Sequence, residues 1–189
     1  MPIKQWLWFN FSQIVENFDN HEIDRSLKGG RYDDQIAIFG NEMQKNIENT
    51  NIFIIGAGAL GCEFLKVFSL MEIASDDKNK HKYTVTVTDN DNIVESNLNR
   101  QFLFRKENIG KSKSKVACQS VKKINPSFNC VDLQARIGSE NEEKFNEKFW
   151  KKQDFVINAV DNVEARKFIS KKCKMYGKIL IEVEPMGLK

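Results

Sequence analysis

A glycine-rich turn is the clearest sign of chemistry in this sequence. Residues 51–61 read N-I-F-I-I-G-A-G-A-L-G, an apolar run that leads directly into Gly56, Gly58 and Gly61. Glycines at this spacing after a buried strand allow a tight turn into a helix and let a ligand phosphate approach the backbone. The following helix offers unpaired N–H groups and the positive end of its dipole to an anion. We therefore predict that this turn, with Ala57 inside it, binds a nucleotide.

Carboxylates follow two other strand-like segments. Asp89 comes after the alternating run 83–88, and Asp161 comes after the apolar run 154–158. Ligands of a parallel sheet lie at the carboxyl ends of its strands, so both side chains should lie near the glycine turn. Asp89 suits the ribose hydroxyls of a nucleotide, or it closes a turn. Asp161 suits Mg²⁺, or it is simply the N-cap of the next helix.

The segment S-N-L-N-R-Q-F-L-F-R at 96–105 is the most informative stretch of the chain. A reaction that builds negative charge on phosphate oxygens needs fixed cations, which Arg100 and Lys113 could supply. Hydride transfer has no such need. The alternative is surface solvation for Arg100 and Arg105, and an exposed lysine face for Lys113 within the lysine-rich run 111–123.

The elements that must position these residues alternate between strands and helices. This alternation predicts an α/β fold, a Rossmann-like, mostly parallel sheet with helices on both faces. Residues 1–30 do not follow the pattern and are predicted to be a leader and linker, which leaves 31–189 for the domain; 75–82 is predicted to be an insertion. Strands are expected at 51–55, 83–88, 128–133, 154–158 and 178–183, and helices at 33–47, after the glycine turn, at 111–124, at 139–150 and after Asn162.

Two local features qualify the predicted helices. Gly40 lies inside the predicted helix 33–47 and weakens it. Ser139 and Glu142 have the spacing of a capping box and favour a helix that begins at 139 and buries Phe145 and Phe149.

The composition is that of an ordinary soluble globular protein, with 41% hydrophobic and 29% charged residues. A net charge of +3 is too small to predict binding to nucleic acid or to an anionic membrane. The four cysteines are widely spaced without a C-x-x-C motif, which argues against a zinc site and a disulfide framework and fits a reducing compartment. The sequence has no signal peptide pattern and no apolar run of about 20 residues, so we expect a cytoplasmic and nuclear protein.

Five motifs, taken in order, carry a family resemblance. G-A-G-A-L-G-C-E, T-D-N-D, S-N-L-N-R-Q-F-L-F-R, G-K-S-K and N-A-V-D-N resemble the adenylation domain of ubiquitin-like-protein activating enzymes. The third motif is specific to that group and its bacterial sulfur-carrier relatives. R-Y-D-D-Q at 31–35, followed by Phe39-Gly40, resembles the lead into the active adenylation domain of the ubiquitin-activating enzyme. The resemblance implies a ThiF/MoeB-like adenylation fold, truncated here.

The resemblance also implies an activity, which is adenylation of the ubiquitin C-terminal carboxylate with ATP and Mg²⁺. The implied partners are ubiquitin, the inactive adenylation domain of the same full-length chain and, through domains outside this sequence, ubiquitin-conjugating enzymes. No nucleic acid or membrane partner is expected. By role, the implied site residues are Asp89 for ribose, Arg100 and Lys113 for phosphates, Asp161 for magnesium, and Asp91, Asn97 and Gln101 for the rest of the pocket.

Two departures from the family pattern lead us to expect a fragment that is inactive alone. The family continues its last strand as E-S-G-T, whereas this chain reads E-V-E-P-M-G-L-K at 182–189. None of the cysteines matches the thioester-forming position, and Cys62 is expected to serve packing. Three alternatives remain: activation of another ubiquitin-like modifier or a sulfur carrier, an NAD(P)-dependent oxidoreductase, and a non-catalytic interaction module.

Overall fold

The computed structural model describes residues 29–75 and 82–183. The predicted leader and insertion lie almost wholly outside these ranges, as does the unusual segment that follows residue 183. The chain divides into two units, 1–44 and 45–189. The site residues predicted above all belong to the second unit.

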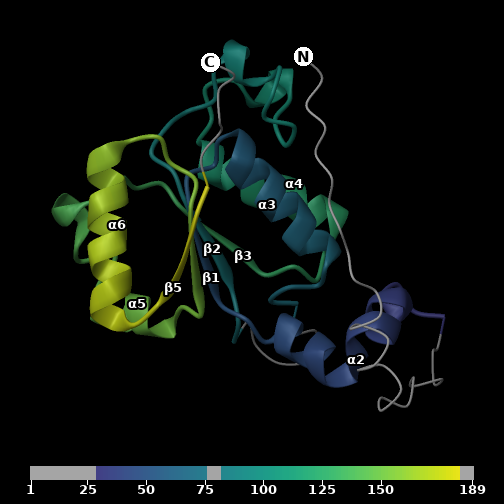
Figure 1. The fold of residues 1–189 in the computed structure, drawn as a ribbon. Coiled ribbons are helices and arrows are strands. Elements are labelled where there is room, and N and C mark those ends of the chain that lie inside the picture. The colour runs from purple at the N-terminus through teal and green to yellow at the C-terminus, as the bar shows by residue number, and fades with distance from the viewer. Residues whose placement is uncertain (1–28, 76–81, 184–189) are drawn as a thin grey trace, which may run out of the picture. The chain divides into compact units, whose positions relative to one another are not determined.

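The described part of the second unit forms a five-stranded parallel sheet (Figure 1). The strand order is β3-β2-β1-β4-β5, so β1 lies at the centre and pairs with β2 on one side and β4 on the other. This arrangement confirms the predicted α/β fold with a parallel sheet. The strands are β1 (Ile52–Ile55), β2 (Val85–Thr88), β3 (Cys130–Leu133), β4 (Phe155–Asn158) and β5 (Ile179–Glu182).

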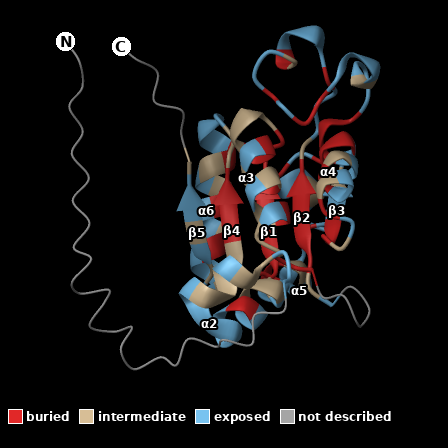
Figure 2. Ribbon diagram, turned by 90° about the vertical axis from the view of Figure 1, so that its right-hand side faces the viewer, coloured by how far each residue is buried: buried red, intermediate tan, exposed pale blue. Residues whose placement is uncertain are grey.

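Helices cover both faces of the sheet. Side chains alternate between the two faces of each strand, so both faces of the central strands present apolar residues for helices to cover. On one face Ile52 and Ile54 pack in a cluster with residues of α3 (Ala59–Leu70) and α4 (Lys113–Ile124). On the other face Phe53 and Ile55 pack with residues of α5 (Glu147–Lys152) and α6 (Val163–Tyr176). Figure 2 shows that the central strands are buried, whereas β5 at the edge is largely exposed.

The helix α2 (Asp33–Glu48) matches the predicted helix 33–47 but is broken at Gly40. Gly40 has φ 82° and ψ 161°, a conformation that glycine adopts far more readily than other residues. Across the break, Gln35 Nε2 donates a hydrogen bond of 2.6 Å to Gln44 Oε1. The helix that was expected to be weakened at Gly40 is therefore kinked at this residue.

The single helix predicted over 139–150 is wrong. A 3₁₀ turn (Ser139–Asn141) comes first, and α5 begins only at Glu147. The cap of α5 is Asn146, whose side chain accepts a 3.0 Å hydrogen bond from Phe149 N. Tertiary packing overrides the local capping signal, because Phe145 and Phe149 both contact the Phe53 ring.

The cysteines also differ from the expectation. Cys118 on α4 and Cys130 at the start of β3 form a disulfide, with their Cα atoms 5.4 Å apart. They meet because the chain reverses after α4 and β3 then runs back along the helix. Cys62 and Cys173 are free and buried, and burial raises the pKa of the Cys62 thiol to about 12. Cys62 thus serves packing, as expected. In the described ranges, none of the helices is both long and apolar enough to cross a membrane.

We predict that reduction of the Cys118–Cys130 disulfide lowers the free energy of unfolding by about 3 kcal/mol, since the bond closes a short loop in the unfolded chain. Urea denaturation with and without a thiol reductant measures the change. A Cys118→Ala variant is the control, because its stability should not respond to reductant. Equal reductant sensitivity in wild type and variant would contradict the prediction.

Candidate functional site

The glycine turn lies between the ends of three neighbouring strands. Gly56 has φ 100°, and its N–H donates a 2.9 Å hydrogen bond to Thr88 O at the end of β2. A Cβ at Gly56 would lie 2.8 Å from Ala159 O, just after β4, and a Cβ at Gly61 would collide with Gly56 O. Gly58 has no atom within 4 Å of such a Cβ. The first and third glycines are therefore required by the packing of the chain, whereas the middle one faces open space.

Asp89 joins the end of β2 to the glycine turn. Its Oδ2 accepts a 2.7 Å hydrogen bond from Ala57 N, and its Oδ1 accepts one of 2.8 Å from Asp91 N. Burial raises the pKa of this carboxyl, against the lowering effect of the two backbone donors and of Lys113. Asp89 thus closes a turn and also lies where a nucleotide ribose was expected. A carboxylate has about four acceptor positions, so two remain for a ligand.

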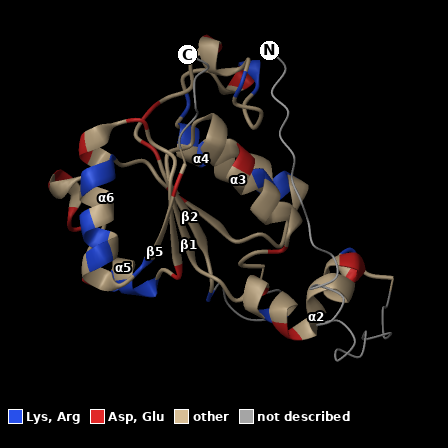
Figure 3. Cartoon of the chain, viewed as in Figure 1, with Lys and Arg blue, Asp and Glu red and all other residues tan. Residues whose placement is uncertain are grey.

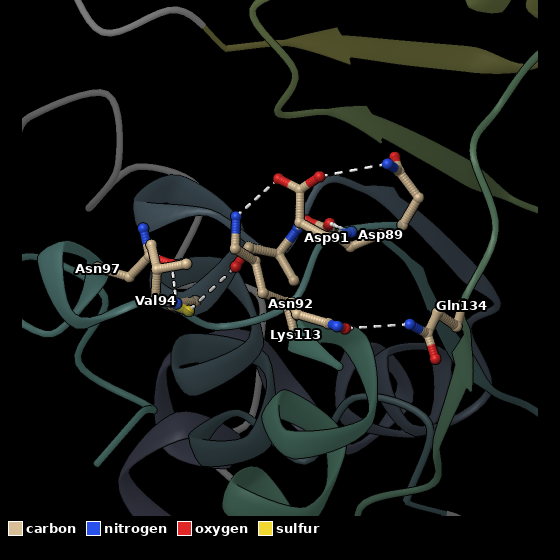
Figure 4. Close-up of polar contacts among 10 residues, drawn as sticks. Asp89, Asp91, Asn92, Val94, Asn97, Lys113 and Gln134 are labelled. Atoms are coloured by element: carbon tan, nitrogen blue, oxygen red, sulfur yellow. Dashed lines mark hydrogen bonds and ion pairs between the residues drawn. The ribbon is translucent and has the colours of Figure 1, made fainter. Parts of the chain in front are cut away.

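Lys113 is the buried cation of the site. Its Nζ lies 2.8 Å from Asp91 Oδ2, and its backbone N–H donates to Asp91 O at 3.0 Å (Figure 4). The residue is 8% exposed, so the alternative of an exposed lysine face is wrong. Lys113 is the first residue of α4, capped by Ser112, whose Oγ accepts from Lys115 N. A cation fixed in this way beside strand-end carboxylates can interact with an anionic ligand.

The loop between β2 and α4 contributes two buried amides. Asn97 Oδ1 accepts a 3.0 Å hydrogen bond from Val94 N, which stabilises the short 3₁₀ turn (Glu95–Asn97). Gln101 is 4% exposed, and its Oε1 has no hydrogen-bond partner among the described residues. An unpaired buried acceptor is costly, but this atom is enclosed by protein and is not open to a ligand in the described structure.

Arg100 and Arg105 bind their own loop. The Nη1 of Arg100 donates to Ser96 O at 2.7 Å and to Asn99 Oδ1 at 3.2 Å, and the Nη1 of Arg105 donates to Phe104 O at 2.8 Å. Both side chains are exposed. Among the described residues, the hydrogen bonds of the Arg100 guanidinium run to Ser96 and Asn99 and not to the glycine turn. The predicted phosphate-binding role of Arg100 thus remains a prediction.

Asp161 lies on the loop that touches the glycine turn. The Cγ1 atom of Val160, the residue before Asp161, would lie 3.3 Å from a Cβ placed on Gly56. The N-cap of α6 is Asn162, whose Oδ1 accepts from Glu164 N at 2.8 Å, so the N-cap alternative for Asp161 is wrong. Asp161 is exposed and makes no hydrogen bond or ion pair with other described residues. One exposed carboxylate beside a predicted phosphate site fits Mg²⁺, which keeps several waters and takes few protein ligands.

Sequence reasoning missed three polar residues that hold the site together. Gln134, just after β3, donates a 3.2 Å hydrogen bond to Asn92 Oδ1 (Figure 4). Asn158, fully buried at the end of β4, donates to Glu182 Oε1 at 3.0 Å. Arg166 donates to carbonyls at the ends of two strands. Of these three residues, only Asn158 has a signal in the sequence, because it is a polar residue in the last position of an otherwise apolar strand.

A parallel sheet with a glycine turn after its central strand and carboxylates at neighbouring strand ends defines a Rossmann-like α/β domain whose ligand site lies at the carboxyl edge. Within this class, the chain belongs to the ThiF family, whose sequence model matches residues 32–189.

Comparison with curated proteins confirms the resemblance to activating enzymes. The chain is 42% identical to ubiquitin-activating enzyme E1 1 of Candida albicans over 193 residues and 42% identical to that of Arabidopsis thaliana over 191 residues. It is 38% identical to ubiquitin-like modifier-activating enzyme 1 of Oryctolagus cuniculus over 191 residues. Each alignment covers all of this chain but only 18%, 17% and 18% of the respective relative.

Solved structures support the fold. The tRNA N6-threonylcarbamoyladenosine dehydratase TcdA of E. coli matches with a TM-score of 0.71 and 19% identity, over 87% of this chain and 63% of that one. The same values hold for TcdA in complex with ATP. At this identity the likeness shows a shared fold.

We predict that Gly61→Ala and Gly58→Ala have different effects. Gly61→Ala should destabilise the fold by at least about 2 kcal/mol, because its Cβ would collide with Gly56 O. Gly58→Ala should cost less than about 1 kcal/mol, since the position is open and only the helix cap is affected. Chemical denaturation of both variants measures the difference, and equal losses would contradict it.

We predict that the Asp89 carboxyl titrates above its ordinary pKa, because it is buried. Because the pKa of Asp89 is higher in the folded than in the unfolded state, protonation of this carboxyl stabilises the fold. This contribution to the free energy of unfolding is complete below the unfolded-state pKa and is lost as pH rises through the folded-state pKa. NMR titration of the Asp89 carboxyl carbon, compared with the urea-unfolded chain, tests this. A lower midpoint in the folded protein would contradict it.

Proposed function

We propose that this chain forms the ATP-binding part of an adenylation domain that joins AMP to the C-terminal carboxylate of ubiquitin. The observation that carries the proposal is the buried Lys113 at the carboxyl edge of the sheet, paired with Asp91 next to the glycine turn. The printed names of the relatives, which are ubiquitin-activating enzymes, support ubiquitin as the substrate.

The proposed reaction needs charge neutralisation more than covalent catalysis. An oxygen of the ubiquitin carboxylate attacks the α-phosphorus of ATP, and the bond from that phosphorus to the bridging oxygen breaks. Pyrophosphate leaves with the electron pair, and an acyl adenylate is formed. In-line displacement of this kind depends on positioning and on fixed positive charge.

Lys113 and Arg100 would supply that charge. Lys113 Nζ would exchange Asp91 Oδ2, now at 2.8 Å, for a phosphate oxygen. Arg100 would turn from Ser96 O toward the triphosphate, where its planar fork can bind two oxygens. Asp91 is largely exposed and is solvated by water when Lys113 leaves it.

The other residues would bind the rest of the nucleotide. Asp89, held by Ala57 N and Asp91 N, has acceptor positions left for ribose hydroxyls. Gln101, which the resemblance assigns to the pocket, would have to turn its enclosed Oε1 outward to meet a ligand. Asp161 would hold Mg²⁺, and the bound ion neutralises phosphate charge. Gly58, open on its Cβ side, leaves room for phosphates close to the backbone.

Two of the three rival functions explain fewer of these contacts. A dinucleotide-dependent oxidoreductase uses the glycine turn and Asp89 but has no need of a buried lysine. A non-catalytic interaction module requires neither Lys113 nor an exposed Asp161 at the edge of the sheet.

We predict that Lys113→Met weakens ATP binding at least tenfold, which corresponds to about 1.4 kcal/mol, because a buried cation is lost from the phosphate site. Isothermal titration with ATP and Mg²⁺ measures the affinity. Lys115→Met, an exposed lysine two residues further along α4, is the matched control and should bind as wild type does. Stabilisation of the wild type by NAD alone in a thermal-shift assay would refute the proposal.

Catalysis is tested by ubiquitin-dependent exchange of pyrophosphate into ATP in the intact protein. The proposal requires that Asp161→Ala lower this exchange at limiting Mg²⁺. Unchanged exchange would favour the non-catalytic alternative.

A further inference from the structure

The loop that carries Asp161 is held by backbone anchors rather than by the Asp161 side chain. It consists of residues 159–162, between the end of β4 and the start of α6. The Asp161 carboxylate is exposed and bonds to none of the described side chains or backbone groups. Its position relative to the glycine turn therefore depends on what fixes the backbone on either side of it.

Arg166 supplies the anchor on the α6 side. Its Nε donates a 2.9 Å hydrogen bond to Val160 O, the carbonyl directly before Asp161. Its Nη2 donates a 3.2 Å hydrogen bond to Val183 O, just after β5. One half-buried guanidinium thus connects the loop after β4 with the chain that leaves β5.

Asn158 and Glu182 connect the ends of the same two strands, β4 and β5, through their side chains. Asn158 is fully buried, and its Nδ2 donates to Glu182 Oε1 at 3.0 Å while its Oδ1 accepts from Val160 N at 3.4 Å. Val183 N donates to Asn158 O at 3.1 Å. Val160 is therefore bonded through both its N–H and its carbonyl, and its side chain lies close to Gly56.

The placement of Arg166 is not explained by the stability of α6 itself. Arg166 is the fourth residue of the helix, where a cation opposes the helix dipole. Many lysines and arginines lie on α5 and α6 (Figure 3), so its charge alone does not distinguish it. Its contacts do, because they run to two carbonyls that are 23 residues apart in the sequence. A lysine ammonium is a single point donor and is poorly suited to span both.

We infer that Arg166 is a positioning residue that fixes Asp161 for Mg²⁺ at the phosphate site. This inference rests on the proposed function, because Asp161 is the proposed magnesium ligand. Arg166 acts through the backbone of Val160 and touches neither substrate nor metal. Residues that orient a metal ligand typically change metal affinity by 10–100-fold when replaced.

The first test uses no catalysis. Amide hydrogen exchange at residues 159–162 should be at least tenfold faster in Arg166→Gln than in the wild type, both without nucleotide and metal. Exchange in the later turns of α6 should be unchanged, and Lys167→Gln, an exposed neighbour on the same helix, should behave as wild type. Unchanged exchange at 159–162, or equal acceleration along the whole of α6, would overturn the inference.

The second test measures the Mg²⁺ concentration that gives half-maximal pyrophosphate exchange in the intact protein at saturating ATP. Arg166→Gln should raise it at least tenfold, with little change in the maximal rate, and Arg166→Lys should restore part of the loss. Asp161→Asn separates the two hypotheses. If Asp161→Asn raises the Mg²⁺ requirement and Arg166→Gln does not, the positioning role is wrong. If neither does, the proposed magnesium role of Asp161 is wrong as well.

Discussion

At the glycine turn the chain passes so close to itself that a Cβ on Gly61 would collide with Gly56 O, and a Cβ on Gly56 would lie 2.8 Å from Ala159 O. This close approach brings the ends of β1, β2 and β4 together. It lets Asp89 reach Ala57 N and sets the Asp161 loop against the turn. The rest of the site follows from this contact, because the other polar groups are positioned relative to these three strand ends.

The charges of the site are paired in different ways. Lys113 is buried and bound to Asp91, so the buried cation is paired; an unpaired one would be costly. Asp161, in contrast, is exposed and its carboxylate is solvated, which costs little. Arg100 is bound to its own loop. A phosphate ligand would require both cations to change partners, Lys113 from the Asp91 carboxylate and Arg100 from Ser96 O.

Much of the fold could be predicted from the sequence, because apolar runs and glycine punctuation are local signals. The five strands and the helix after Asn162 lie where their patterns predicted them. The start of α5 could not be predicted, since it depends on how Phe145 and Phe149 pack against Phe53. In α3, helical spacing predicts an apolar face of Leu60, Phe64, Phe68 and Met71, but these side chains are only half-buried, whereas Cys62, Leu65 and Ser69 are fully buried.

The candidate site shows the same division. Spacing along the chain was enough to select the glycine turn and the strand-end carboxylates. The burial of Lys113 and the cap of α6 by Asn162 decided alternatives that the sequence had left open, because both depend on side-chain direction. The Cys118–Cys130 bond, described above as a matter of stability, has a mechanical consequence as well. It joins the middle of α4 covalently to the start of β3, so the helix that begins with Lys113 is tied to the edge strand of the sheet by a bond as well as by packing.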